Sequence, residues 1–309
     1  MLNYIIRRLL QGLVVMLIVS FATFGLMHLA PGSPIDLMLG EAGRVTDEQI
    51  ASIERQWGLD RPFHEQYIIW LGNVLQGDLG ESVVRRGVPV LDMVSEAAWV
   101  TIQLNTLAIA LAVGVSLPVG VLAATWRYSR FDYASMVGAT LGVALPNFWL
   151  GLMLIILFTA TLGILPGSGW GSWQQMILPV IVMAVENTAI FARMMRSSTI
   201  EVMTQDYVQV AKAKGLAQIP IILRHVVRNS LLPVISVIGW RIAFILSGTI
   251  VVETVFGVPG LGRLFITSVD RLDYQVMQGI VLLFAVVVVI GNLLTDLTYA
   301  YIDPRIRLS

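Results

Sequence analysis

The sequence contains no cysteine and only three histidines, so it has few groups for metal or thiol chemistry. The histidines, His28, His64 and His225, lie far apart with no H-x-x-x-H spacing. The lack of Cys excludes disulfides and thiolate metal sites, and scattered imidazoles disfavour a metalloenzyme. The chain also lacks G-x-x-x-x-G-K-[ST], G-x-S-x-G and a pair of acids suited to acid/base work in a soluble cleft. We therefore expect a non-catalytic chain that binds no cofactor and no metal.

Charged residues are scarce as well. They make up 13% of the 309 residues against 56% hydrophobic residues, and the mean hydropathy is +0.78. This composition excludes an ordinary soluble protein, and a net charge of zero gives no sign of a nucleic-acid partner. A hydrocarbon core of ~30 Å needs about 20 apolar residues per helix. Six stretches qualify as spans: 9–30, 100–126, 134–170 with a helix to about Leu162, 177–192, 231–252 and 276–297.

Basic residues are distributed unevenly between the two sides of these spans. Short cytoplasmic loops retain Lys and Arg during insertion. Only Arg263 and Arg271 fall in the short loops opposite the N-terminus. The side of the N-terminus carries twelve: Arg7, Arg8, Arg127, Arg130, Arg193, Arg196, Lys212, Lys214, Arg224, Arg228, Arg305 and Arg307. We expect both termini to be cytoplasmic.

The outward segment 31–98 carries two predicted amphipathic helices. Thr46 and Gln49 form a capping-box pattern for a helix that ends before Gly58. Pro62 opens a second helix. Its apolar face contains Phe63, Tyr67, Trp70, Leu71 and Val74. This face suits either a cover over the ends of the spans or a docking surface for a soluble partner, and both interpretations stay open.

The loop 193–230 between the fourth and fifth spans has a helix–Gly–helix pattern. Asp206 suits a helix N-cap, and Tyr207, Val210, Ala211 and Lys214 follow with helical spacing. Gly215 ends this helix as a residue with left-handed freedom, and Pro220 starts a second one. Such an element on the cytoplasmic face of a transporter resembles a docking element, although most basic loops there only follow the charge rule.

Several passages carry a more specific resemblance. The stretches 206–216 (DYVQVAKAKGL) and 224–233 (RHVVRNSLLP) resemble the cytoplasmic loop of the B-type permease subunits of dipeptide, oligopeptide, glutathione and nickel ABC importers. Further passages are similar to that family in the same order: HLAPGSP at 28–34, GLDRP at 58–62, GDLGES at 77–82, ETVFGVPGLGR at 253–263 and DPRIR at 303–307. The resemblance covers nearly the whole chain.

The resemblance implies an all-α, six-span permease of the type I ABC importer fold in the bacterial inner membrane, forming half of a pathway for peptides or peptide-like solutes. It implies four partners: a homologous second permease subunit, two ATP-binding subunits that hold ATP and magnesium, and a periplasmic solute-binding protein. The implied parts of the chain are 1–30 with the first span, a periplasmic segment 31–98, a core 99–300 and a tail 301–309. The loop 201–233 would sit in a groove on one ATPase. Its coupling residues would be Asp206, Tyr207, Ala211, Lys212, Lys214, Gly215, Leu216, Arg224 and Arg228.

Two charges interrupt the predicted spans. Glu186 and Arg241 each fall ~14 Å into a span at 1.5 Å per residue. An isolated charge at that depth costs ~2.5 to 3.5 kcal/mol, so we expect pairing or water access. They either tie two helices together or form a polar wall of the translocation pathway, with Arg241 facing a solute carboxylate. Asn147 and Asn187 are further candidates for that wall.

A stand-alone secondary carrier is the alternative function. It would use Glu186 as a protonatable site and need no ATPase, although no inverted repeat is visible. In the third span, Gly138 and Gly142 form G-x-x-x-G, which predicts a helix-packing face rather than a pore element.

Overall fold

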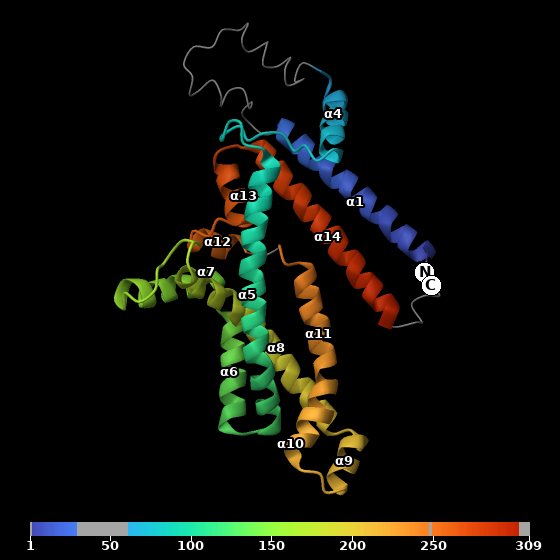
Figure 1. The fold of residues 1–309 in the computed structure, drawn as a ribbon, viewed down its shortest axis with the longest axis vertical. Coiled ribbons are helices and arrows are strands. Elements are labelled where there is room, and N and C mark those ends of the chain that lie inside the picture. The colour runs from blue at the N-terminus through green and yellow to red at the C-terminus, as the bar shows by residue number, and fades with distance from the viewer. Residues whose placement is uncertain (1, 30–60, 247–248, 303–309) are drawn as a thin grey trace. The chain divides into compact units, whose positions relative to one another are not determined.

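The computed structural model describes residues 2–29, 61–246 and 249–302 (Figure 1). The described part is almost entirely helical, and its β pairing is the isolated bridge between Glu81 and Pro89. The predicted all-α class is therefore confirmed. The chain forms two compact units, residues 1–99 with 260–309 and residues 100–259. The predicted helix at 46–58 lies outside the described residues.

The first unit contains α1 (Leu2–Leu29), α4 (Phe63–Leu75), α13 (Leu261–Asp270) and α14 (Tyr274–Ile302). Helix α1 packs along α14. Gly12 lies where the two helices approach, since a Cβ there would come within 2.6 Å of Val289. Small residues allow helix backbones to approach closely in this way. A candidate span covers Ile6–Gly25 of α1, and another covers Tyr274–Leu293 of α14.

Helix α4 begins after Pro62, as predicted, and its aromatic face packs on α1. Phe63, Tyr67 and Trp70 contact Phe24 through tilted or edge-on rings, with ring centroids 5.3 to 5.6 Å apart. The Tyr67 hydroxyl also lies 2.9 Å from Ser20 Oγ. This face is therefore occupied by α1, which favours the covering interpretation over the docking one.

The turn that contains the GDLGES passage is fixed to the start of α14. Ser82 Oγ donates a hydrogen bond to the Asp273 carboxylate and accepts one from the backbone N–H of Arg85 at 2.8 Å. Ser82 and Asp273 are both buried. Gly80 takes a positive φ of 80°, which a residue without Cβ adopts freely. The passage thus has a structural role within this unit.

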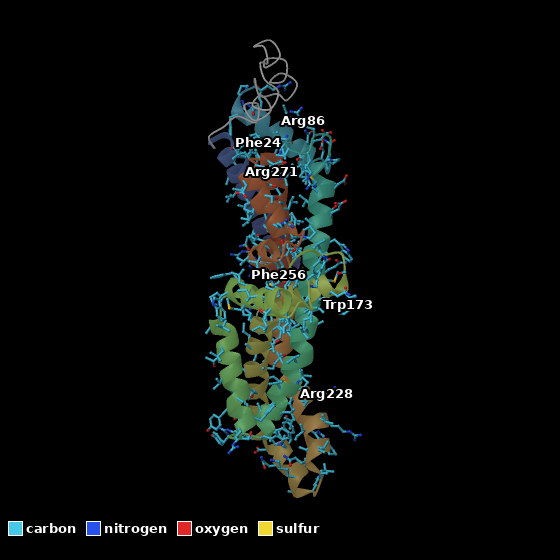
Figure 2. The ribbon with its side chains drawn as sticks, turned by 90° about the vertical axis from the view of Figure 1, so that its left-hand side faces the viewer. Phe24, Arg86, Trp173, Arg228, Phe256 and Arg271 are labelled. Carbon is cyan, nitrogen blue, oxygen red and sulfur yellow. The ribbon has the colours of Figure 1, made fainter. Side chains whose placement is uncertain are left out.

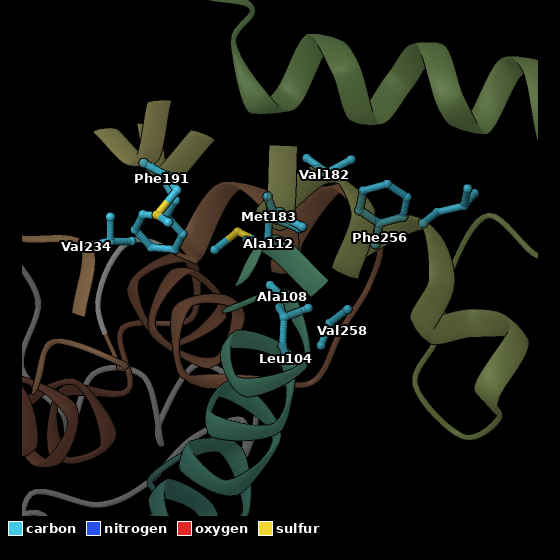
Figure 3. Close-up of a cluster of buried hydrophobic side chains, with 13 residues drawn as sticks. Leu104, Ala108, Ala112, Val182, Met183, Phe191, Val234, Phe256 and Val258 are labelled. Atoms are coloured by element: carbon cyan, nitrogen blue, oxygen red, sulfur yellow. The ribbon is translucent and has the colours of Figure 1, made fainter. Parts of the chain in front are cut away.

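The second unit is a helical bundle around one apolar core. It contains most of α5 (Val90–Thr125) together with α6 (Arg130–Ala144), α7 (Asn147–Leu154), the π-helix η1 (Ile155–Thr161), α8 (Trp173–Met203), α9 (Asp206–Ala213), α10 (Gln218–Ile221), the π-helix η2 (Ile222–Val226), α11 (Val227–Ala243) and α12 (Ile250–Val255). Leu104, Val182, Phe191, Val234 and Phe256 meet in the core (Figure 3). Helices α5, α8 and α11 therefore share one buried interior.

The third predicted span is not one continuous helix. The chain bends by 105° between α6 and the α7–η1 segment. Leu145 leaves the helical region, with ψ 124°, because the following Pro146 disfavours a helical conformation there. Counting this bent pair as one span, the described residues hold up to six spans, and otherwise five.

The G-x-x-x-G prediction in α6 is half right. A Cβ on Gly142 would lie 3.2 Å from Val185 and 3.3 Å from Ala189 of α8, so this glycine does allow close helix packing. Gly138 faces open space instead, with nothing within 4 Å of such a Cβ. The packing of α6 on α8 therefore uses one of the two glycines.

The bounds of the second and fifth predicted spans also differ from those expected. Helix α5 begins at Val90, ten residues before the predicted start at 100. The fifth span covers Gln218–Ala243 rather than 231–252, and α12 is a separate helix from Ile250. Hydropathy could not locate the end of α11, because the sequence remains apolar from α11 into α12.

Candidate functional site

The predicted helix–Gly–helix element is present at one end of the second unit. Helix α8 ends at Met203, α9 follows from Asp206, and α10 continues through η2 into α11. Figure 1 shows α9 and α10 projecting beyond the ends of α8 and α11. Figure 2 places Arg228 towards this end, well away from Trp173 and Phe256. We call residues 201–233 the coupling element.

The coupling element has a small apolar core of its own. Val208 and Ala211 of α9 pack against Ile221 and Val226, and Val202 and Met203 border the cluster. Gly215 joins the two halves with a φ of +78°, as the sequence predicts. This core therefore joins both halves to the end of α8 and to η2, which continues directly into α11.

Two predicted helix starts in this element are wrong by one or two residues. The N-cap of α9 is Gln205, in extended conformation, so Asp206 is the first helical residue and no side chain caps the helix. Asp206 still lies in the first turn, where the positive end of the helix dipole stabilises a negative charge. Helix α10 starts at Gln218, so Pro220 lies inside its first turn, where a missing N–H costs no helical hydrogen bond.

Most of the predicted coupling residues are exposed. Ala211 is the exception, since it belongs to the small core. The exposed ones are Asp206, Tyr207, Lys212, Lys214, Gly215, Leu216, Arg224 and Arg228. Large apolar side chains accompany them, among them Ile219, which is 71% exposed, and Leu223, which is 63% exposed. The element presents a mixed apolar and basic surface of the kind that binds a partner protein.

One hydrogen bond links α9 directly to α11. Asn229 Nδ2 donates to the Tyr207 hydroxyl at 2.9 Å and to the carbonyl of His225 at 2.9 Å. The sequence pattern did not indicate Asn229 as a site residue, because its partner lies 22 positions earlier, beyond any helical repeat. The bond gives α9 a polar connection to α11 in addition to the apolar core.

The structure brings Glu186 and Arg241 together. Arg241 Nη2 lies 3.3 Å from Glu186 Oε1, and the two side chains are 31% exposed for Arg241 and 39% exposed for Glu186. Arg241 lies in the last turn of α11, not midway along a continuous span as expected. There the negative end of the helix dipole stabilises its positive charge. An interrupted helix at membrane depth is tolerated where it is buried in protein or lines a water-filled cavity.

The two asparagine candidates do not join this pair. Asn187 is buried and donates to the Met183 carbonyl of its own helix at 3.0 Å, while its Oδ1 has no hydrogen-bond partner in the described part of the chain. Asn147 is the first residue of α7 and is half-buried. In the described residues, no hydrogen bond connects either asparagine to Glu186 or Arg241.

A second ion pair, which the sequence did not predict, connects α6 to α8. Arg196 donates from Nε and Nη2 to the Asp132 carboxylate, at 2.5 and 2.7 Å. Asp132 is buried and also accepts from the backbone N–H of Tyr128 at 2.9 Å. These two-point bonds fix both groups in place, unlike the single bond between Glu186 and Arg241.

The sequence matches known families and proteins of binding-protein-dependent transport systems. Residues 116–308 match the family model of the binding-protein-dependent transport system inner membrane component, and residues 1–114 match its N-terminal model. The chain is 38% identical to the oligopeptide transport system permease protein AppB of Bacillus subtilis (strain 168), over 98% of this chain and 99% of that one. It is 40% identical to the glutathione transport system permease protein GsiC of Escherichia coli (strain K12), over 99% of each.

Solved structures show the same fold at low sequence identity. A structure described as an inward-facing conformation of the MetNI methionine ABC transporter aligns with a TM-score of 0.56 at 16% identity, over 68% of this chain and 96% of that one. A crystal structure of an amino acid ABC transporter with histidines aligns with a TM-score of 0.50 at 15% identity, over 67% and 92%. This chain is a multi-pass inner membrane component of a binding-protein-dependent transport system, and it belongs to the ABC importer permease family.

Proposed function

We propose that this chain forms half of the translocation pathway of an ATP-driven importer for peptides or peptide-like solutes. A homologous second permease would supply the other half, two ATPases would hold ATP and magnesium, and a periplasmic binding protein would deliver the solute. Support for the solute class comes from the oligopeptide and glutathione permeases to which the chain is similar over nearly its full length. Both termini would be cytoplasmic by the distribution of Lys and Arg.

The observation that carries the proposal is the coupling element. It projects from the second unit and combines exposed apolar side chains with Lys212, Lys214, Arg224 and Arg228. Exposed apolar side chains next to basic ones suit a groove on a soluble ATPase. Its core and the Tyr207–Asn229 bond would carry the movement of that ATPase to α8 and α11.

The pathway itself would include Glu186 and Arg241. Both side chains are about a third exposed, and a charged group in that position is stable only where it faces protein or water rather than lipid. The single bond of 3.3 Å leaves other guanidinium donors of Arg241 for a solute carboxylate. Asn147 and Asn187 would contribute further polar surface to the pathway.

The carrier alternative has less support. It requires a protonatable Glu186 and is favoured by an inverted repeat, and no such repeat is visible in the sequence. It also gives no role to the coupling element. We therefore retain the importer as the proposed function.

Native mass spectrometry of the tagged chain, purified gently from its host, tests the proposal. We expect it to travel with two ATP-binding subunits and one homologous permease. A lone chain or a homo-oligomer that transports solute without ATP would contradict the proposal and favour a Glu186-dependent carrier.

Replacing Arg241 by Gln tests the pathway residues in that purified complex. We expect assembly and thermal stability to stay nearly unchanged, because a partly exposed pair contributes at most about 1 kcal/mol. Uptake of a tri-alanine probe should fall, since an arginine–carboxylate contact is worth about 2 kcal/mol, or roughly 30-fold. Loss of assembly would instead show that the pair only ties α8 to α11, and unchanged uptake would remove Arg241 from the pathway.

A further inference from the structure

The turn between α5 and α6 gathers aromatic and basic side chains outside the site described above. Trp126, Tyr128, Phe131 and Tyr133 are 53%, 65%, 38% and 61% exposed. Arg127 and Arg130 stand among them and are exposed as well. We call these six residues the aromatic-basic turn. Tryptophan and tyrosine favour the membrane–water interface, where an apolar ring and a polar edge are both satisfied.

The positive charge of this turn is not neutralised by the nearby acid. Asp132 is the single acidic residue between Glu96 and Glu186 in the sequence. It is buried, and its carboxylate accepts hydrogen bonds from Nε and Nη2 of Arg196. Neither Arg127 nor Arg130 forms a salt bridge in the part of the chain that the structure describes. Two guanidinium groups therefore remain available to an anion.

The backbone of the turn is held in one conformation. Tyr128 has a φ of +65°, a region that a bulky residue enters at a cost. The Asp132 carboxylate accepts its backbone N–H, and the Ser129 hydroxyl accepts the N–H of Asp132 to cap α6. Arg127 lies with its guanidinium carbon 4.6 Å from the centre of the Tyr128 ring. The backbone of the turn is thus fixed before a ligand binds, which reduces the entropy lost on binding.

The chemistry of the turn points to one ligand. We infer that the aromatic-basic turn binds the headgroup of an anionic phospholipid, with Arg127 and Arg130 on the phosphate and Trp126 and Tyr128 among the glycerol and upper acyl carbons. Guanidinium groups match phosphate oxygens in charge and geometry. The turn also joins one candidate span, in α5, to the start of the bent α6–η1 pair, so it belongs at the end of a span. A soluble anion would gain nothing from the four exposed rings.

Lipid retention measured by native mass spectrometry tests this inference. The purified complex is stripped of lipid and mixed with phosphatidylglycerol, with phosphatidylcholine, or with phosphatidylglycerol plus millimolar inorganic phosphate. Each arginine near an anionic surface contributes a factor of about five to binding. We expect the R127Q/R130Q double variant to retain phosphatidylglycerol about 25-fold less tightly at this site, the product of two such factors, and to bind phosphatidylcholine as the wild type does.

The R85Q/R86Q double variant is the matched control. It removes two exposed arginines from the other unit, so the same change in charge should leave the tight phosphatidylglycerol site intact. Equal loss of phosphatidylglycerol retention in both double variants would mean that only the overall charge matters, and it would overturn the inference. If millimolar inorganic phosphate displaced phosphatidylglycerol from this site, the occupant would be a soluble phosphate rather than a lipid, and the inference would be wrong. Unchanged lipid retention with loss of an ATPase subunit in R127Q/R130Q would make the turn a protein contact instead.

Discussion

Replacing Gly215 by Trp is expected to abolish ATP-driven transport while the chain still folds. Gly215 has a φ of +78°, and no atom lies within 4 Å of the point that a Cβ would occupy, so a large side chain would project from the coupling element. The added side chain strains the backbone by roughly 1–2 kcal/mol. In a partner's groove it would cost about 2 kcal/mol more, or roughly 30-fold in affinity. Uptake and ATP hydrolysis are measured together in proteoliposomes, and we expect uptake to be lost while ATP hydrolysis persists.

Gly163→Trp is the matched control for this experiment. Gly163 also has a positive φ, of +63°, and open space around a Cβ, but it lies in the turn after η1 rather than in the coupling element. It should carry a similar backbone strain and keep transport near the wild-type rate. Equal loss in both variants would attribute the effect to strain and remove Gly215 from the coupling function.

Breaking the Asp132–Arg196 pair is expected to have the largest effect on stability. The Asp132→Ala variant leaves a partly buried arginine without its carboxylate and also removes the acceptor for the Tyr128 N–H. Loss of one partner from a buried pair costs about 3 kcal/mol or more. For a chain of this size we expect the apparent Tm of the purified complex to fall by about 6 °C. Thermal unfolding in detergent measures this shift.

Two substitutions on α8 control for that result. Arg193→Gln removes an exposed charge three residues before Arg196, and Glu186→Gln removes one member of the looser pair. Both should lower the apparent Tm by no more than about 1 to 2 °C. A Tm for Asp132→Ala within that range would show that the pair between α6 and α8 contributes little to stability.

The features that the sequence predicts well are local ones. Long uncharged runs specify membrane helices directly, because a span must satisfy its own backbone in lipid. The positive φ of Gly215 and the start of α4 after Pro62 follow from conformational preferences that act within a few residues. The helix–Gly–helix form of the coupling element was therefore predictable, apart from shifts of one or two residues at its helix starts.

The features that the sequence did not predict depend on residues that are distant in the chain. Asp132 and Arg196 lie 64 positions apart, and Ser82 and Asp273 lie 191 apart. No periodic pattern connects such residues, since helical spacing reports only which face of one helix a side chain occupies. In the sequence alone, Arg196 is only one of twelve basic residues that orient the chain.

The sequence by itself determined that this protein crosses the membrane several times and carries a folded loop suited to docking. Hydropathy and backbone preference act locally, so they can be read along the chain. Tertiary structure decided which charges meet, that α11 ends at Ala243 with Arg241 in its last turn, and that the third span bends by 105°. These depend on packing between helices, because a charge or a helix end in an apolar bundle is stable only where another helix supplies its partner.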